Sequence, residues 1–195
     1  TLMTVRAVHW YEGMFLRPQH FQAAQRYLHE MADRSVRWDQ QYAWGLRAAE
    51  IDLDALANYR FVVRDLKARL RDGTLISIPE DGNLPNFDLK SAFDGGNTVT
   101  IYLAVPVLQV ARANVADGGE ANGARFVIDR QQLEDENTGL NPQPVEVRLL
   151  NMKLLLSSDD HGGYEVLPIA RIKRADRAEA VPELDESYIP PLLAC

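Results

Sequence analysis

Apolar residues repeat with one period before Gln40 and with a different period after it. Between residues 18 and 39, no Gly or Pro follows Pro18, and apolar positions recur every three or four residues, as on one face of an α-helix. Further along, Val99, Ile101 and Leu103 occupy every second position, which is the spacing of a half-buried strand. No helical pattern separates the later strand segments. The sequence therefore predicts a mainly β chain, an antiparallel β-sandwich with a long N-terminal helix.

Turn residues and changes of phase indicate how the strands connect. Residues 71–74, Arg-Asp-Gly-Thr, predict a hairpin turn into a strand at 75–78, because Gly73 can supply the positive φ of a tight turn. The alternation slips by one residue at 63–66 and again at 149–150. We interpret each slip as a β-bulge inside one continuous strand. Further strands are expected at residues 44–53, 98–106, 125–132 and 164–173, with a turn at 161–163 before the last of them.

Two long connections are polar and rich in Gly or Pro, at residues 79–97 and 114–123, and both are predicted to be exposed loops. The domain organisation that follows is an N-terminal arm at residues 1–17, a helix at 18–39 and a β-sandwich domain at 40–183. Pro190-Pro191 is a stiff spacer, so we expect residues 184–195 to begin a linker to further domains.

Composition excludes several classes of function. The one cysteine, Cys195, permits no disulfide framework and no cysteine-based zinc site, and it suits a reducing compartment. The formal charge of -7 argues against a nucleic-acid partner. No apolar run approaches the roughly 20 residues that span a bilayer, so direct membrane insertion is not expected.

No catalytic constellation stands out either. The four histidines lack the spacing of metal ligands, and neither a phosphate-binding glycine loop nor a Gly-x-Ser-x-Gly elbow is present. The acidic clusters at 134–136 and 159–160 are typical of solvated loops. The sequence thus predicts no catalytic residue, no cofactor and no metal.

The N-terminal arm is unusually apolar, because the terminal segments of a chain are ordinarily polar unless they pack against another part of a protein. Its large side chains predict either an interface with a partner or an intramolecular core that fixes the arm to the sandwich. The candidates are Trp10, Met14, Phe15 and Leu16 of the arm, together with Phe21 at the start of the helix.

The apolar stripe of the helix leaves a similar choice. It either docks on the domain's own sheet or forms a seam between subunits. It comprises Ala24, Leu28, Met31, Ser35 and Trp38.

One long motif resembles a known family. Residues 9–22, His-Trp-Tyr-Glu-Gly-Met-Phe-Leu-Arg-Pro-Gln-His-Phe-Gln, are similar to the opening signature W-x-E-G-M-F-L-x-P-Q-H-F-Q of the TssK family of baseplate subunits in bacterial type VI secretion. Asp72-Gly73, the segments 103–106 and 135–139, and the Leu-Asp…Ile-Pro-Pro ending at 184–191 resemble TssK positions in the same order. The resemblance covers nearly the whole chain and corresponds to the N-terminal part of a longer protein.

The resemblance implies a fold and a role. In the family this part is a shoulder, a β-sandwich similar to the shoulder of siphophage receptor-binding proteins, and a neck and a head follow it. It implies a non-enzymatic homotrimer whose shoulder docks onto the TssF–TssG wedge. The absent head would link the baseplate to TssL and TssM at the cytoplasmic face of the inner membrane. The alternatives that the residues leave open are a carbohydrate-binding β-sandwich module and a glycosidase that uses the acidic loops.

Overall fold

The computed structural model describes residues 5–117, 123–174 and 180–193. These residues form two compact units, one up to Ala43 and the other from Trp44 to Leu193. The first unit is the N-terminal arm with a single helix, α1 (Pro18–Asp39), over the range that the sequence predicts. Pro18 is the first helical residue, where the missing proline N–H has no partner to lose.

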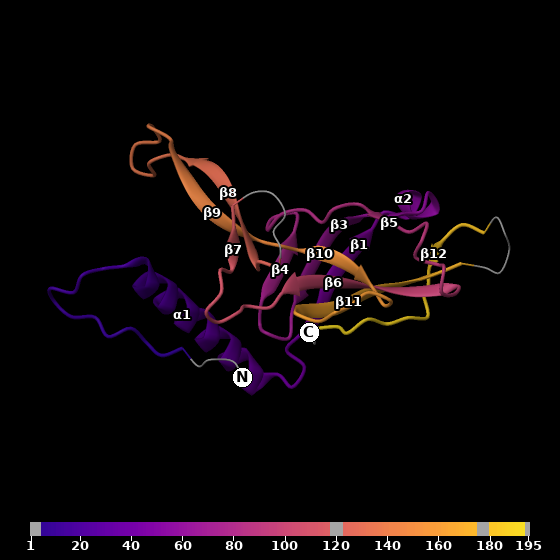
Figure 1. The fold of residues 1–195 in the computed structure, drawn as a ribbon, viewed down its shortest axis with the longest axis horizontal. Helices are drawn as coiled ribbons and strands as arrows, with labels where there is room; N and C mark the ends of the chain where they lie inside the picture. Colours follow the sequence, from indigo (N-terminus) through magenta and orange to yellow (C-terminus); the bar gives the residue numbers. More distant parts are fainter. Residues whose placement is uncertain (1–4, 118–122, 175–179, 194–195) are drawn as a thin grey trace. The chain divides into compact units, whose positions relative to one another are not determined.

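The second unit is built on two antiparallel sheets (Figure 1). The first sheet has the strand order β1-β3-β4 and the second has the order β10-β6-β11-β12. The bounds of the first are β1 (Gly45–Ile51), β3 (Val63–Arg69) and β4 (Leu75–Ile78). Those of the second are β6 (Thr98–Pro106), β10 (Lys153–Leu156), β11 (Tyr164–Lys173) and β12 (Glu183–Leu184).

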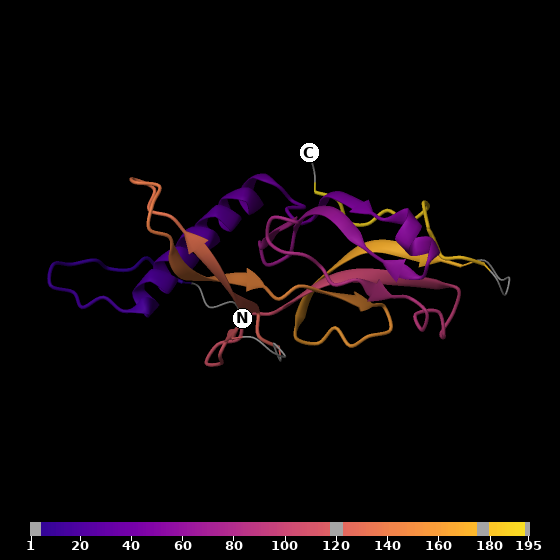
Figure 2. The same ribbon diagram turned by 90° about the horizontal axis from the view of Figure 1, so that it is seen from above.

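Smaller elements complete this unit. A short pair joins β2 (Arg60–Phe61) to β5 (Phe87–Asp88), and a short helix, α2 (Leu53–Ala57), precedes β2. A third sheet, in the order β7-β8-β9, contains β7 (Val115–Ala116), β8 (Phe126–Leu133) and β9 (Gln143–Leu150). Figures 1 and 2 both show the β8–β9 hairpin extending away from the two larger sheets.

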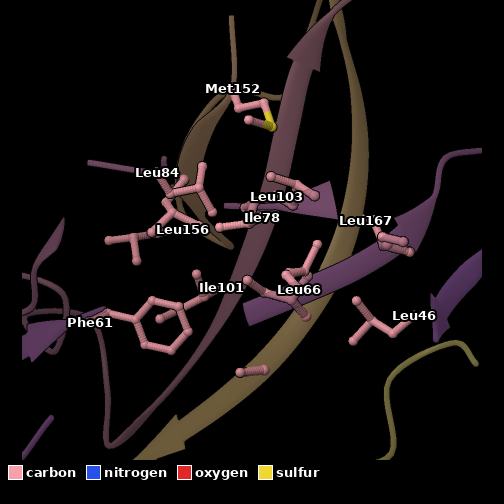
Figure 3. Packing of buried hydrophobic residues seen from close by; sticks show 14 of the residues in the cluster. Leu46, Phe61, Leu66, Ile78, Leu84, Ile101, Leu103, Met152, Leu156 and Leu167 are labelled. Atoms are coloured by element: carbon pink, nitrogen blue, oxygen red, sulfur yellow. The ribbon is translucent and has the colours of Figure 1, made fainter. Parts of the chain in front are cut away.

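The hydrophobic core lies between the two larger sheets. Figure 3 shows Leu66 of β3, Ile101 and Leu103 of β6, and Leu167 of β11 turned toward one another, and all four are 0–1% exposed. The alternation that predicted β6 is the cause, because every second residue of that strand faces the opposite sheet. The predicted fold class, mainly β and antiparallel with an N-terminal helix, is confirmed.

The hairpin turn at residues 71–74 is also confirmed. Strands β3 and β4 pair antiparallel across it, Gly73 has φ +87°, and the Leu70 N–H donates to the Thr74 carbonyl at 2.9 Å. Strands β4 and β11 have the bounds expected from the alternation, and Pro106 ends β6.

Of the two predicted β-bulges, the first is confirmed in part and the second is wrong. Inside β3, Asp65 pairs with Glu50 and Val63 pairs with Ile51, so the register shifts by one residue at Arg64. That strand does not continue back to Phe61, because residues 60–61 form β2, which pairs with β5. At the second slip β9 ends at Leu150 and β10 begins at Lys153 in a different sheet. At this second slip, the one-residue change of phase marks the place where the chain leaves one sheet and enters another.

The prediction of an exposed loop at residues 79–97 is also wrong in part. Leu84, Leu89 and Phe93 are buried in the core, and β5 lies between them. Polar residues around each leucine mask this in the sequence. In the other long connection, β7 pairs in parallel with β8, and residues 118–122 lie outside the described residues.

Candidate interaction surface

The N-terminal arm folds back along α1 (Figure 1). The Val5 N–H donates to the Glu30 carboxylate at 3.2 Å, and the Trp10 ring lies 6.4 Å from the rings of both His20 and Phe21. A residue early in the arm therefore meets the middle of the helix, and a later residue meets its beginning. The arm and α1 run antiparallel as one small unit.

A turn at Gly13 makes this reversal. Gly13 has φ +81°, a conformation that favours glycine, and the Met14 N–H donates to the Tyr11 carbonyl at 3.3 Å. The helix then begins with a local hydrogen bond, in which the Arg17 N–H donates to Nδ1 of His20 at 3.0 Å. The Gly-Met-Phe-Leu-Arg-Pro-Gln-His segment is thus a turn followed by a helix start.

Four of the five candidate residues in the arm and at the helix start are exposed and one is half-buried. Phe15 has 78% of its surface exposed, Trp10 51%, and Leu16 and Phe21 are similarly open, whereas Met14 is half-buried. Trp10 and Phe21 contact each other, and Phe15 lies 5.6 Å from the Arg17 guanidinium. The structure therefore brings part of the set together at the helix start. Whether these residues bind a partner stays a prediction.

The stripe on α1 is largely exposed. Leu28, Met31 and Trp38 are exposed, Trp38 at 81%, Ala24 is half-buried, and no residue of α1 is buried. Its predicted use as a seam stays a prediction.

In the second unit, sequence reasoning missed the residue that fixes the β8–β9 hairpin to the sandwich. Arg125, 5% exposed, donates to the Pro106 carbonyl at 2.7 Å, to Asp72 at 2.7 Å and to the Thr74 hydroxyl at 2.6 Å. These partners lie at the end of β6 and in the β3–β4 turn. Nothing in the sequence around Arg125 indicates that this arginine joins the hairpin to the sandwich.

The predicted acidic clusters build turns. The Asp135 carboxylate accepts from the Asn137 N–H at 2.8 Å, which lowers the pKa of Asp135. Asp159 accepts from the Leu156 N–H at 2.7 Å, and Asp160 accepts from the Gly162 N–H at 2.8 Å. These carboxylates stabilise the β8–β9 tip and the β10–β11 connection, two separate places in the fold.

A shallow pocket of about 320 Å³ lies between β1, β11 and residues 184–192. Leu46, Ile169 and Leu192 give it an apolar lining, and Asp185 is among its polar residues. A hydrogen bond from the Ser187 hydroxyl, at 2.6 Å, lowers the pKa of Asp185, while burial raises the pKa of Tyr188. No acidic pair faces across this pocket, since its two carboxylates, Asp185 and Glu186, are consecutive.

One wall of this pocket is the segment 190–193, which is fastened to β1. The Leu46 N–H donates to the Pro191 carbonyl and the Leu193 N–H donates to the Leu46 carbonyl, both at 2.8 Å. Leu46 and Leu192 form a parallel bridge. The sequence predicts that residues 184–195 begin a linker. In the structure, residues 184–193 belong to the second unit.

Within the described residues, no cluster of three or more His, Cys, Asp or Glu has the arrangement of a metal site. None of the helices in the described ranges combines the length and the apolar character needed to cross a membrane.

Comparison with known proteins connects this chain to bacterial secretion. A family model described as bacterial type VI secretion (EvfL, ImpJ, VasE) matches residues 20–195. The chain is 34% identical over 187 residues to the type VI secretion system baseplate component TssK1 of Pseudomonas aeruginosa. That match covers 94% of this chain and 41% of the relative, so this chain spans less than half of the relative's length.

Solved structures agree with this likeness. A chain of the TssK-TssF-TssG baseplate subcomplex of type VI secretion, determined by cryo-electron microscopy, is similar with a TM-score of 0.88 at 29% identity, over 97% of this chain and 63% of that one. The crystal structure of TssK is similar with a TM-score of 0.84 at 23% identity, over 97% of this chain and 42% of that one, which is a likeness of fold.

Proposed function

The chain belongs to the TssK family of bacterial type VI secretion, and from that premise we propose that it serves as a structural adaptor in the secretion baseplate. The observation that carries the proposal is the exposure of Trp10, Phe15, Leu16 and Phe21. Large apolar side chains gathered at one exposed place are characteristic of a surface that a partner covers. The main apolar cluster of the sandwich, in contrast, is buried between its sheets.

The partner that we propose is the TssF–TssG wedge. A relative of this chain at 29% identity is part of a TssK-TssF-TssG subcomplex, and the present chain matches it over 97% of its own length. In our proposal the N-terminal arm and the start of α1 dock on the wedge through the four exposed side chains. Met14, the fifth residue of the predicted set, is half-buried.

The remaining parts of the proposed role concern the whole protein. We propose a homotrimer, with the stripe on α1 as a subunit seam, and a linker after the sandwich that leads to a neck and a head. That head would connect the baseplate to TssL and TssM at the cytoplasmic face of the inner membrane. No catalysis is proposed, and three acidic residues of the two predicted clusters, Asp135, Asp159 and Asp160, accept backbone hydrogen bonds in turns.

Retention by a TssF–TssG complex tests the docking. The chain should be retained, and Phe15→Ser with Leu16→Ser should weaken retention at least tenfold while the β-rich circular dichroism spectrum is kept. The matched control is Leu75→Ser, since Leu75 is exposed on β4 and far from the arm in sequence. If the folded chain is not retained, or if the arm variant is retained as well as the control, the proposal is wrong.

A carbohydrate-binding module is less well supported. Such a module needs exposed aromatic side chains on a sheet face, where a sugar ring can stack. Among the described residues, the exposed aromatic side chains are Trp10, Tyr11, Phe15, Phe21, Trp38 and Tyr42, and none lies in a strand. Binding of the chain to a glycan array would revive this alternative.

A further inference from the structure

Strand β9 is the outer strand of the sheet β7-β8-β9 and belongs to a hairpin that extends away from the sandwich (Figures 1 and 2). The direction of its backbone groups follows from one hydrogen bond. The Asn151 N–H donates to the Arg125 carbonyl at 2.9 Å, so Asn151 turns its backbone toward β8. In antiparallel strands this direction alternates, and Glu146 and Arg148 therefore turn their N–H and C=O groups to the outer edge.

The sequence along this edge is symmetric in charge and in polarity. It reads Val145-Glu146-Val147-Arg148-Leu149, with an aliphatic residue at the centre, opposite charges beside it and aliphatic residues outside them. We propose that β9 pairs antiparallel with β9 of a second copy of this chain, centred on Val147. In that register Glu146 of each copy lies opposite Arg148 of the other, and Val145 lies opposite Leu149.

The backbone groups agree with this register. Glu146 and Arg148 are both outward-facing residues, so the N–H and C=O groups of each can bond those of the other in the second copy. Registers centred on Glu146 or on Arg148 also satisfy the backbone, but they place like charges opposite each other, which is destabilising. Charge therefore selects the register centred on Val147.

Pro144, which lacks an N–H, does not prevent this pairing. In the proposed register Pro144 lies opposite Leu150 of the second copy. The Leu150 carbonyl already accepts from the Met152 N–H at 3.0 Å, so it does not need a donor from the opposite strand. Pro144 thus stands at an edge position where an N–H donor is dispensable.

The side chains form two distinct faces. Val145, Val147 and Leu149 share one face, where Val145 is 38% exposed and the other two are half-buried. On the other face, Arg130 of β8 bonds Glu146 at 3.1 Å, and Arg148 lies with its guanidinium 4.6 Å from the centre of the Phe126 ring. Pairing would extend this into a row of alternating charge, Arg130, Glu146 and then Arg148 of the second copy.

This contact has twofold symmetry, because the same strand is used on both sides. It cannot close a ring of three copies. It goes beyond the proposed docking on the wedge and is independent of it: in a trimeric protein it would join subunits of two different trimers.

Charge reversal provides a test with a built-in rescue. Sedimentation velocity over a concentration series should show reversible dimers of the chain. Glu146→Arg alone and Arg148→Glu alone should each weaken association about tenfold, since two opposite-charge pairs become like-charge pairs. An equimolar mixture of the two single variants should associate as well as the original chain, because every cross-strand pair is again opposite in charge. The double variant should likewise recover.

A chain that stays monomeric at all concentrations overturns the proposal. Pro144, Glu146 and Arg148 would then serve to keep the exposed edge of β9 from pairing with another strand. Association that is equal in all variants also overturns it, because the contact must then lie elsewhere. Neither result bears on retention by the TssF–TssG complex, so the two proposals can fail separately.

A disulfide tests the register directly. Opposed residues at a non-hydrogen-bonded position have Cα atoms about 4.5 Å apart, within the range that a disulfide bridges. In a Cys195→Ser background, Val147→Cys should form a linked dimer on mild oxidation. Gln131→Cys, on β8 inside the same sheet, should not. A folded Val147→Cys variant that links no better than this control contradicts the proposed register.

Discussion

A methyl group at position 45 would collide with the backbone of residues 191 and 192. A Cβ built on Gly45 would lie 2.7 Å from the Pro191 oxygen, and Gly45 has φ +135°, which L side chains rarely adopt. We expect Gly45→Ala to lower the free energy of unfolding by about 2 kcal/mol, measured by urea denaturation. Gly95→Ala is the control, because nothing lies within 4 Å of a Cβ there. Equal stability of the two variants would contradict the tight contact.

Arg125 joins three elements at a buried position. Its ion pair with Asp72 is 2.7 Å long, with side-chain exposures of 6% and 17%. Arg125→Met removes one partner and leaves the Asp72 charge without it, so we expect a loss of about 3 kcal/mol in unfolding free energy. Arg130→Met, on β8 and 64% exposed, should change stability by less than about 1 kcal/mol. Amide exchange at the base of the β8–β9 hairpin should rise only in the first variant.

Asp185 gives the C-terminal part of the second unit a dependence on pH. Its pKa is lowered below the ordinary value of 3.8, first by the Ser187 hydroxyl. A lowered pKa means that the ionised form stabilises the fold above the unfolded-state pKa, and that this contribution is lost as the pH falls through the folded-state pKa. The original chain should therefore be more stable than Asp185→Asn at pH 6, and the difference should shrink below pH 3.8. A difference that is constant from pH 6 to pH 3 would contradict this assignment.

At the scale of elements, α1 should tolerate polar substitutions that a core helix would not. Leu28 and Trp38 are exposed, and no residue of α1 is buried. Leu28→Ser and Trp38→Ser should each change unfolding free energy by about 0.5 kcal/mol or less. Phe61→Ala, in the buried core, should cost about 3–5 kcal/mol. A large loss from either helix variant, measured by thermal or urea unfolding, would mean that the stripe is packed within the chain.

The sequence predicted those elements whose pattern repeats within one sheet or one helix. Helix α1 follows from Pro18 and an uninterrupted apolar stripe, and β6 follows from strict alternation. The change of sheet between Leu150 and Lys153 could not be predicted, because a phase slip looks the same whether the register shifts within a strand, as in β3, or the strand ends, as β9 does. Leu89 and Phe93 were missed because isolated apolar residues in a polar segment form no period.

The candidate surface was predictable in composition only. The sequence identifies Trp10, Phe15 and Leu16 as large and apolar, but the folding back of the arm depends on the turn at Gly13 and on the bond from Val5 to Glu30. Such a contact joins residues 25 positions apart without any repeat. Arg125 was missed for the same reason, since its partners are distant in the sequence.

At the scale of the whole molecule, the core belongs to one unit. Every residue of the main hydrophobic cluster lies between Leu46 and Ile172. Residues 44–195 without the first 43 should therefore fold cooperatively, with a urea midpoint close to that of the full chain. Loss of the cooperative transition would show that the N-terminal unit is required for the sandwich to fold.

The fastening of residues 190–193 to β1 has a mechanical consequence. The two segments run parallel, and the bonds that join them, from Leu46 to Pro191 and from Leu193 to Leu46, lie across their common direction. A force that pulls Trp44 and Leu193 apart would act along the segments and load both bonds at once. The second unit would thus resist extension as a clamp under shear, and its core would carry no load until that clamp had given way.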